Sequence, residues 1–148
     1  MMKKKIVLLA AIFFAAIFTH AQKSPVYISN DIAVNGYDVV SYFTEGKPVK
    51  GKKTFLYQWH DAYWLFSTRE NLDSFSHNPE RYAPQFGGYC AYGISEGHKA
   101  PTQPDAWTIA NGKLYLNYNT EVRTLWKKDM NERITKATGN WDSLKNKE

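Results

Sequence analysis

The stretch Thr54 to Phe66, TFLYQWHDAYWLF, decides the fold of this 148-residue chain. Its first six residues and its last four are rich in aromatic and branched side chains, which favour strands. Between them, His60-Asp61-Ala62 can form a turn. The pattern therefore predicts a β-hairpin with strands at residues 54–59 and 63–66.

A helix is predicted directly after this hairpin. Ser67 and Glu70 form an S-x-x-E capping box, which is typical of a helix start. The apolar side of the helix includes Leu72 and Phe75. Asn78-Pro79 ends it, because the residue before a proline disfavours the helical conformation.

A second hairpin is predicted at residues 106–118, with Asn111-Gly112 at its turn. Asn-Gly is the strongest short-range signal for a two-residue hairpin turn, since both central residues need a positive φ. Asn119 or Thr120 can cap a final helix, and Gly139 is expected to end it. Two hairpins among short helices, with a helix at the C-terminus, predict a small single domain of the α+β class.

The first 21 residues resemble an export signal. Lys3 to Lys5 form a basic start, residues 6–18 form an uncharged apolar run, and Thr19-His20-Ala21 offers small residues for cleavage. A transmembrane anchor needs about 20 apolar residues, so this run is too short to favour one. We expect residues 1–21 to be removed and residues 22–148 to form a periplasmic or secreted domain that does not insert into a membrane.

Charge and composition exclude one class of partner. Three of the 19 Lys and Arg residues lie in the expected signal, which leaves 16 basic against 14 acidic side chains. No basic cluster of the kind that lines a nucleic-acid groove stands out, so we expect no nucleic-acid partner. The many aromatic side chains are sufficient for a core without disulfides, and the sequence does not predict an oligomeric state.

The only cysteine, Cys90, lies in a glycine-flanked motif, GGYCAYG, at residues 87–93. Exported proteins usually pair their thiols, so a single one is intermolecular, reactive or buried. The surrounding residues 84–104 have the least regular pattern in the chain but are too apolar for disorder. We expect an ordered functional loop with a short helical turn around Cys90.

These motifs together resemble the YHS domain family, which includes modules attached to heavy-metal transporters. The resemblance covers about residues 35–82, with residues 83–144 as a C-terminal extension. It rests on Asp38 to Ser41, Tyr63 to Thr68, Asn71, Phe75, Asn78-Pro79-Glu80 and Tyr82. The motif around Cys90 is similar to that of an exported subgroup, in some of whose members selenocysteine replaces the cysteine. The resemblance implies metal or redox chemistry.

Three positions depart from the metal-binding pattern of that family. Metal-binding members carry cysteines where this chain has Ser41, Ser67 and Asn71. Soft metals prefer thiolates, and serine hydroxyls replace them poorly. We therefore expect the usual YHS metal site to be absent, with Ser67 and Asn71 serving as helix-start residues.

Two interpretations of Cys90 remain open. In the first, Cys90 is a catalytic thiolate that reacts with an external thiol or redox partner, or it binds a soft metal ion (copper or zinc) together with His98. In the second, Cys90 is a small buried side chain and His98 a solvated loop residue. The protein is then a non-catalytic module whose aromatic surface, including Tyr89, Tyr92 and Trp107, binds a small ligand or a protein.

Overall fold

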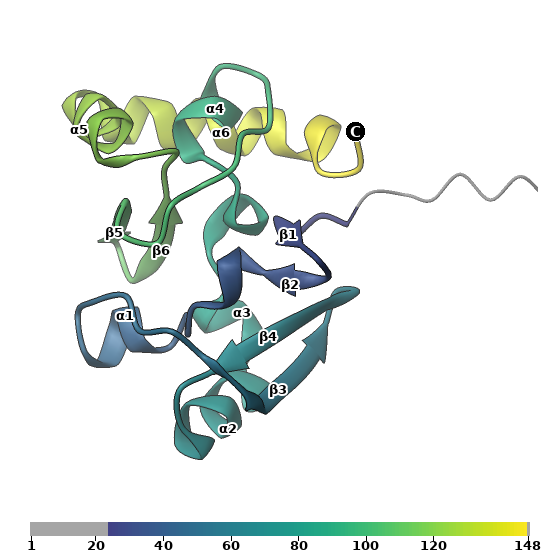
Figure 1. Cartoon of the computed structure of the whole chain (residues 1–148). Helices are drawn as coiled ribbons and strands as arrows, with labels where there is room; N and C mark the ends of the chain where they lie inside the picture. Colours follow the sequence, from purple (N-terminus) through teal and green to yellow (C-terminus); the bar gives the residue numbers. More distant parts are fainter. Residues whose placement is uncertain (1–23, 148) are drawn as a thin grey trace, which may run out of the picture.

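The structure, a computed structural model, describes residues 24–147, so the predicted signal peptide lies outside the described residues. Helices are interspersed with strands along the chain, and the strands form two sheets (Figure 1). This arrangement confirms the α+β class. The elements are β1 (Ile28–Ser29), β2 (Ile32–Ala33), η1 (Val34–Gly36), α1 (Ser41–Thr44), β3 (Lys52–Trp59), β4 (Ala62–Phe66), α2 (Arg69–His77), α3 (Pro79–Tyr82), η2 (Gln85–Gly88), α4 (Ala91–Ser95), β5 (Trp107–Ala110), β6 (Lys113–Leu116), α5 (Thr120–Lys128) and α6 (Met130–Leu144).

The predicted first hairpin is confirmed as β3 and β4, which belong to a sheet of order β1-β2-β4-β3. Its turn is one residue tighter than predicted: His60 and Asp61 have φ of 50° and 57°, and Ala62 already begins β4. The parallel pairing of β2 with β4 through Ile32 and Tyr63 was not predicted. Strands of two residues are too short to show an alternating pattern.

The start of α2 differs from the prediction by one residue. Thr68, not Ser67, is the N-cap, and its hydroxyl accepts a hydrogen bond from the Asn71 backbone N–H at 3.1 Å. Ser67 lies one residue before this position, and its hydroxyl is directed at Asp38, to which it donates at 2.7 Å. The end of α2 at Asn78 is as predicted, although α3 follows at once.

The second hairpin is confirmed, and the final helix is corrected. Asn111 and Gly112 have φ of 51° and 72°, as a two-residue turn requires. Asn119 caps α5, as predicted, but the helix breaks at Asp129 and resumes as α6. The prediction that Gly139 ends the helix is wrong, because α6 runs through it and places Trp141 and Leu144 against the protein core.

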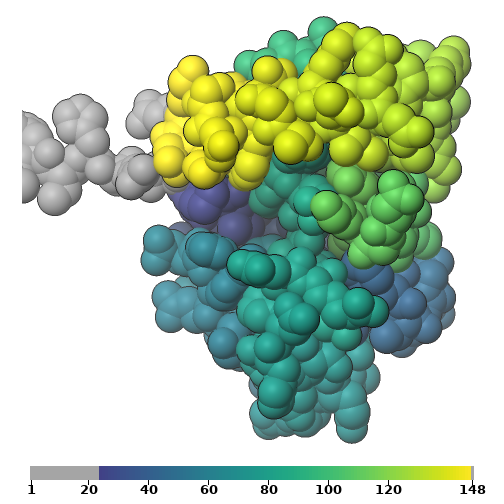
Figure 2. All heavy atoms as spheres, turned by 180° about the vertical axis from the view of Figure 1, so that it is seen from behind, coloured from purple at the N-terminus to yellow at the C-terminus, as the bar shows by residue number. Residues whose placement is uncertain are grey.

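Two apolar cores share strand β6, and we call them the first and the second core. Leu114 and Leu116 on one face of β6 belong to the first core, whereas Tyr115 on the other face belongs to the second. The first core lies under the β3–β4 hairpin and α2; its largest buried side chains are Tyr42, Trp64, Phe66 and Phe75. The second lies under α4, α5 and α6, which form the upper layer in Figure 2; it includes Phe86, Ile94, Trp126 and Ala137.

Candidate functional site

Asp38 is the centre of a buried polar cluster at the position where the YHS resemblance places metal ligands. Its side chain is fully buried. One carboxylate oxygen accepts hydrogen bonds from the backbone N–H groups of Val40 at 2.9 Å and Ser41 at 3.3 Å. The other accepts from the Ser67 N–H at 2.8 Å, the Ser67 hydroxyl at 2.7 Å and the Asn71 side-chain amide at 2.7 Å. Five donors therefore point at one carboxylate.

The cluster brings Ser41, Ser67 and Asn71 together from three segments. The Asn71 amide nitrogen lies 3.4 Å from the Ser41 hydroxyl oxygen and 3.5 Å from that of Ser67. A soft metal ion does not fit this set, because it holds no thiolate or imidazole and its donors already saturate the carboxylate. The cluster ties α1 to the end of β4 and the start of α2, which is a structural role.

Cys90 lies at the start of α4, in the short helical turn that the sequence predicts. Its side chain is only 2% exposed. The sulfur accepts a hydrogen bond from the Tyr118 backbone N–H at 3.2 Å, and the thiol donates to the Asn117 side-chain oxygen at 3.6 Å. That oxygen also accepts from the Tyr92 N–H at 3.3 Å. The thiol is therefore part of a buried hydrogen-bonded contact between α4 and the segment after β6.

The environment of Cys90 favours the neutral thiol. Burial raises its pKa, and the backbone N–H groups of Gly93, Tyr118 and Tyr92 only partly oppose this effect. Reactive cysteines have the opposite arrangement, with a lowered pKa and access to solvent. The surroundings of Cys90 are those of a structural cysteine.

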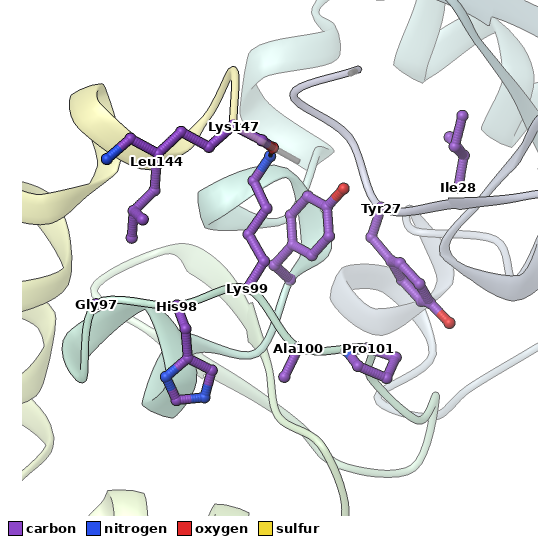
Figure 3. Close-up of a pocket in the computed structure, with 10 residues that line it drawn as sticks. Tyr27, Ile28, Gly97, His98, Lys99, Ala100, Pro101, Leu144 and Lys147 are labelled. Atoms are coloured by element: carbon purple, nitrogen blue, oxygen red, sulfur yellow. Dashed lines mark hydrogen bonds between the residues drawn. The ribbon is translucent and has the colours of Figure 1, made fainter. Parts of the chain in front are cut away.

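His98 lies in a loop beside a cavity of about 580 Å³ (Figure 3). Its imidazole points away from the Tyr27 side chain across the cavity, and its Nε2 lies close to Gly93. Among the hydrogen bonds of residues 24–147, none joins Cys90 to His98. Within the same range, no three His, Cys, Asp or Glu side chains are grouped closely enough to hold a metal ion. The Cys90–His98 metal site stays a prediction.

The three aromatic residues predicted to form a binding surface lie in different surroundings. Tyr89 is buried in the wall of the cavity beside His98. The Arg133 guanidinium lies over the Tyr92 ring, with its Cζ 3.9 Å from the ring centroid. Trp107 packs against Tyr42, with ring centroids 5.3 Å apart.

A second cavity, which we call the tryptophan cavity, was not predicted. It has a volume of about 470 Å³ and lies between the first and second cores. Trp59 and Trp64 form one wall, with ring centroids 5.7 Å apart. Phe86 and Trp141 form the other, with centroids 6.0 Å apart. Figure 2 shows the surface recessed between α6 above and the part that contains β3, β4 and α2 below.

Polar groups surround this aromatic interior. His60 stacks edge-on against Trp59 at 4.0 Å between centroids, and Glu80 and Lys145 add one charge of each sign. Trp59 and Trp141 are half-buried, and they are more accessible than the buried Trp64 and Phe86. Cavities of this size, mainly apolar with a few polar groups and placed between two structural units, are typical of small-molecule sites. No local pattern indicates it, because its walls come from distant parts of the chain.

Comparison with known proteins yields one match. No curated protein and no solved structure matches the chain, and no helix within residues 24–147 has the length and apolar character needed to cross a bilayer. The family match begins two residues after Asp38 and ends at Phe86, in the wall of the tryptophan cavity. Residues 40–86 match the family model of the YHS domain, so a YHS domain is detected in this part of the chain.

Proposed function

We propose that this protein is a non-catalytic binding module that takes a small, flat, apolar or aromatic ligand into the tryptophan cavity. The observation that carries the proposal is a cavity of about 470 Å³ that is lined by two aromatic pairs, Trp59 with Trp64 and Phe86 with Trp141. We further propose that residues 22–148 act as one exported unit, since the cavity needs both the YHS-like part and its C-terminal extension.

The thiol and metal alternatives have weaker support. YHS domains are associated with metal binding, yet the Asp38 cluster offers hydrogen-bond donors instead of metal ligands. Cys90 is buried and its pKa is raised, which disfavours a thiolate at neutral pH. We therefore propose that Cys90 is structural.

The expected affinity follows from the area that a ring would bury. A single aromatic ring system removes roughly 150 Å² of apolar surface from water, worth about 4 kcal/mol. Association also costs translational and rotational freedom, so a Kd of about 1 mM is the tightest that we expect for a ring alone. A natural ligand that also bonds to His60, Glu80 or Lys145 would bind more tightly.

Calorimetric titration with indole and with p-cresol tests the proposal. We expect each probe to bind the native protein saturably, with a Kd of about 1 mM or weaker. Trp59→Leu and Trp141→Leu should each weaken it by a factor of roughly 2 to 10, because each removes an aromatic contact worth about 0.5–1.5 kcal/mol. Trp107→Leu is the matched control: it removes a half-buried tryptophan that lies outside the cavity, and binding should not change.

The same titration separates this proposal from thiol chemistry. Cys90→Ala should bind the probes as the unmodified protein does. If neither probe binds, or if Trp107→Leu weakens binding as much as Trp141→Leu does, the tryptophan cavity is not the site. Copper or zinc retained by the native protein and lost in Cys90→Ala or His98→Ala would instead support the metal site predicted from the sequence.

A further inference from the structure

The four-stranded sheet has one face that carries exposed apolar side chains, and we call it the outer sheet face. Trp64 and Phe66 of β4 point into the first core, so Tyr63 and Leu65, which alternate with them, lie on the opposite face of the sheet. Across the strands, Leu65 pairs with Leu56 and Tyr63 pairs with Ile32. Leu56 is 42% exposed and Tyr63 is 38% exposed. Leu65 is only 7% exposed, so the exposed apolar part of this face consists of Leu56 and Tyr63.

Four lysines lie close together in the sequence, just before β3 and at its start. Lys47, Lys50, Lys52 and Lys53 are all exposed, and no acidic residue occurs in the sequence from residue 46 through residue 60. None of the salt bridges found within residues 24–147 involves any of the four. The result is a local concentration of positive charge in a domain whose expected mature net charge is only slightly positive.

A groove of about 350 Å³ joins the charged and apolar parts. Lys50 and Lys53 line it together with Ile32 and Leu65. Two asparagines and a serine complete its polar wall, and no carboxylate lines it. The groove therefore offers cations and neutral hydrogen-bonding groups above an apolar floor.

We propose that the outer sheet face docks onto the surface of a membrane that contains anionic phospholipids, with a lipid phosphate between Lys50 and Lys53. Lysines near an anionic bilayer are attracted to it, and exposed apolar side chains enter the region between headgroups and acyl chains. Leu56 and Tyr63 lie where they would make that second contact. A soluble anion would use the lysines but would leave both apolar side chains in water.

Co-sedimentation with lipid vesicles tests this proposal, using the chain that starts at Gln22. Both cores lie within residues 24–147, and this start excludes the apolar run of residues 6–18. We expect binding to vesicles of phosphatidylcholine with about 30% phosphatidylglycerol, little binding to phosphatidylcholine alone, and loss of binding at high salt. Each lysine near the surface should contribute a factor of about five, so Lys50→Gln with Lys53→Gln should weaken partitioning about 25-fold.

Two further variants make the outcome specific. Lys127→Gln with Lys128→Gln on α5 removes the same charge elsewhere and should change partitioning less than about two-fold. Leu56→Ser should weaken it several-fold without changing the charge. Equal loss in both lysine pairs would mean unspecific attraction and would overturn the proposal, as would unchanged binding in Leu56→Ser. Release of the protein from vesicles by millimolar glycerol 3-phosphate would assign the groove to a soluble phosphate ester and would also overturn it.

Discussion

Asp38 shows how a single buried carboxylate can join three segments of the chain by hydrogen bonds. Five donors meet its carboxylate, and the side chain is fully buried. A buried charge is costly unless it is hydrogen-bonded, and here each oxygen accepts at least two such bonds. Replacing any part of this arrangement leaves buried groups without partners.

Asp38→Asn should therefore destabilise the protein markedly. The new amide group would place a donor among donors, and leaving such groups unsatisfied costs about 3 kcal/mol. Chemical denaturation measures the change in the free energy of unfolding. Asp73→Asn, on an exposed position of α2, is the control and should change stability by less than about 0.5 kcal/mol. A similarly small effect of Asp38→Asn would show that the cluster contributes little.

Cys90 should make stability depend on pH in the alkaline range. Burial raises the pKa of its thiol in the folded protein, while in the unfolded chain the thiol titrates near about 8.5. Above that pH the unfolded chain has released a proton that the folded protein still holds. The free energy of unfolding must then fall as pH rises, by up to about 1.4 kcal/mol per pH unit.

The measurement is the difference in the free energy of unfolding between the native protein and Cys90→Ala, from about pH 7 to about pH 10. This range brackets the pKa of the thiol in the unfolded chain. Other titrating groups contribute equally to both proteins and cancel. We expect a constant difference at low pH and a declining advantage of Cys90 at high pH. An advantage that grows with pH would reveal a stabilised thiolate and would support the reactive-thiol interpretation.

Among the elements, α6 departs most from the sequence-based expectation, because it continues through Gly139. A β-carbon added at Gly139 would have no neighbouring atom within 4 Å. Glycine in a helix interior is less favourable than alanine by roughly 0.5–1 kcal/mol, since it has more conformational freedom to lose. The position therefore lowers stability without a packing role.

Gly139→Ala should stabilise the protein by about 0.5–1 kcal/mol. Gly112→Ala provides the contrast, because its φ of 72° suits glycine and this variant should be less stable than the native protein. Thermal unfolding of the two variants measures both effects. A loss of stability in Gly139→Ala would indicate that the chain turns at this glycine, as helix-end patterns alone predict.

A third element-scale feature is the attachment of the end of α6 to the loop that holds His98. The Lys99 amino group donates to the backbone oxygens of Lys145 at 2.9 Å and Lys147 at 2.8 Å, and lies 4.9 Å from the Tyr89 ring centroid. Hydrogen bonds from a charged donor contribute about 1.5–3 kcal/mol. This contact holds the turn that follows α6, next to the tryptophan cavity.

Lys99→Met should loosen that turn selectively. We expect the amide hydrogens of Lys145 and Lys147 to exchange at least about ten-fold faster, while amides in β4 keep their rates. Hydrogen exchange followed by NMR provides the measurement. Uniformly faster exchange across the protein would point to global destabilisation instead of a local clamp.

At the scale of the whole molecule, the sequence predicts what depends on neighbouring residues. The two hairpins, the Asn111-Gly112 turn and the helical turn at Cys90 are local patterns, and all are present. Ser67 was misassigned as a cap because its hydroxyl bonds to Asp38, which is 29 residues away. The tryptophan cavity is lined by both Trp59 and Trp141, which lie far apart in the sequence. Residues so far apart form no local pattern from which a shared cavity could be predicted.

The two cores also explain why the proposed binding site lies outside the motif that is most conspicuous in the sequence. Strand β6 contributes side chains to both cores, and the tryptophan cavity opens between them. Residues 40–86 supply Trp59, Trp64 and Phe86, whereas Trp141 comes from the region beyond the matched YHS domain. We therefore expect binding in this cavity to depend on the complete fold, while the Cys90 segment packs α4 against the second core.

The most direct test is to follow the five tryptophan indole N–H signals by two-dimensional NMR while indole is added to the protein. We predict saturable shifts for Trp59, Trp64 and Trp141, and unchanged signals for Trp107 and Trp126, which lie outside the cavity. Shifts confined to the backbone amides around Cys90 and His98, with the signals of the three cavity tryptophans unchanged, would contradict the proposed binding site.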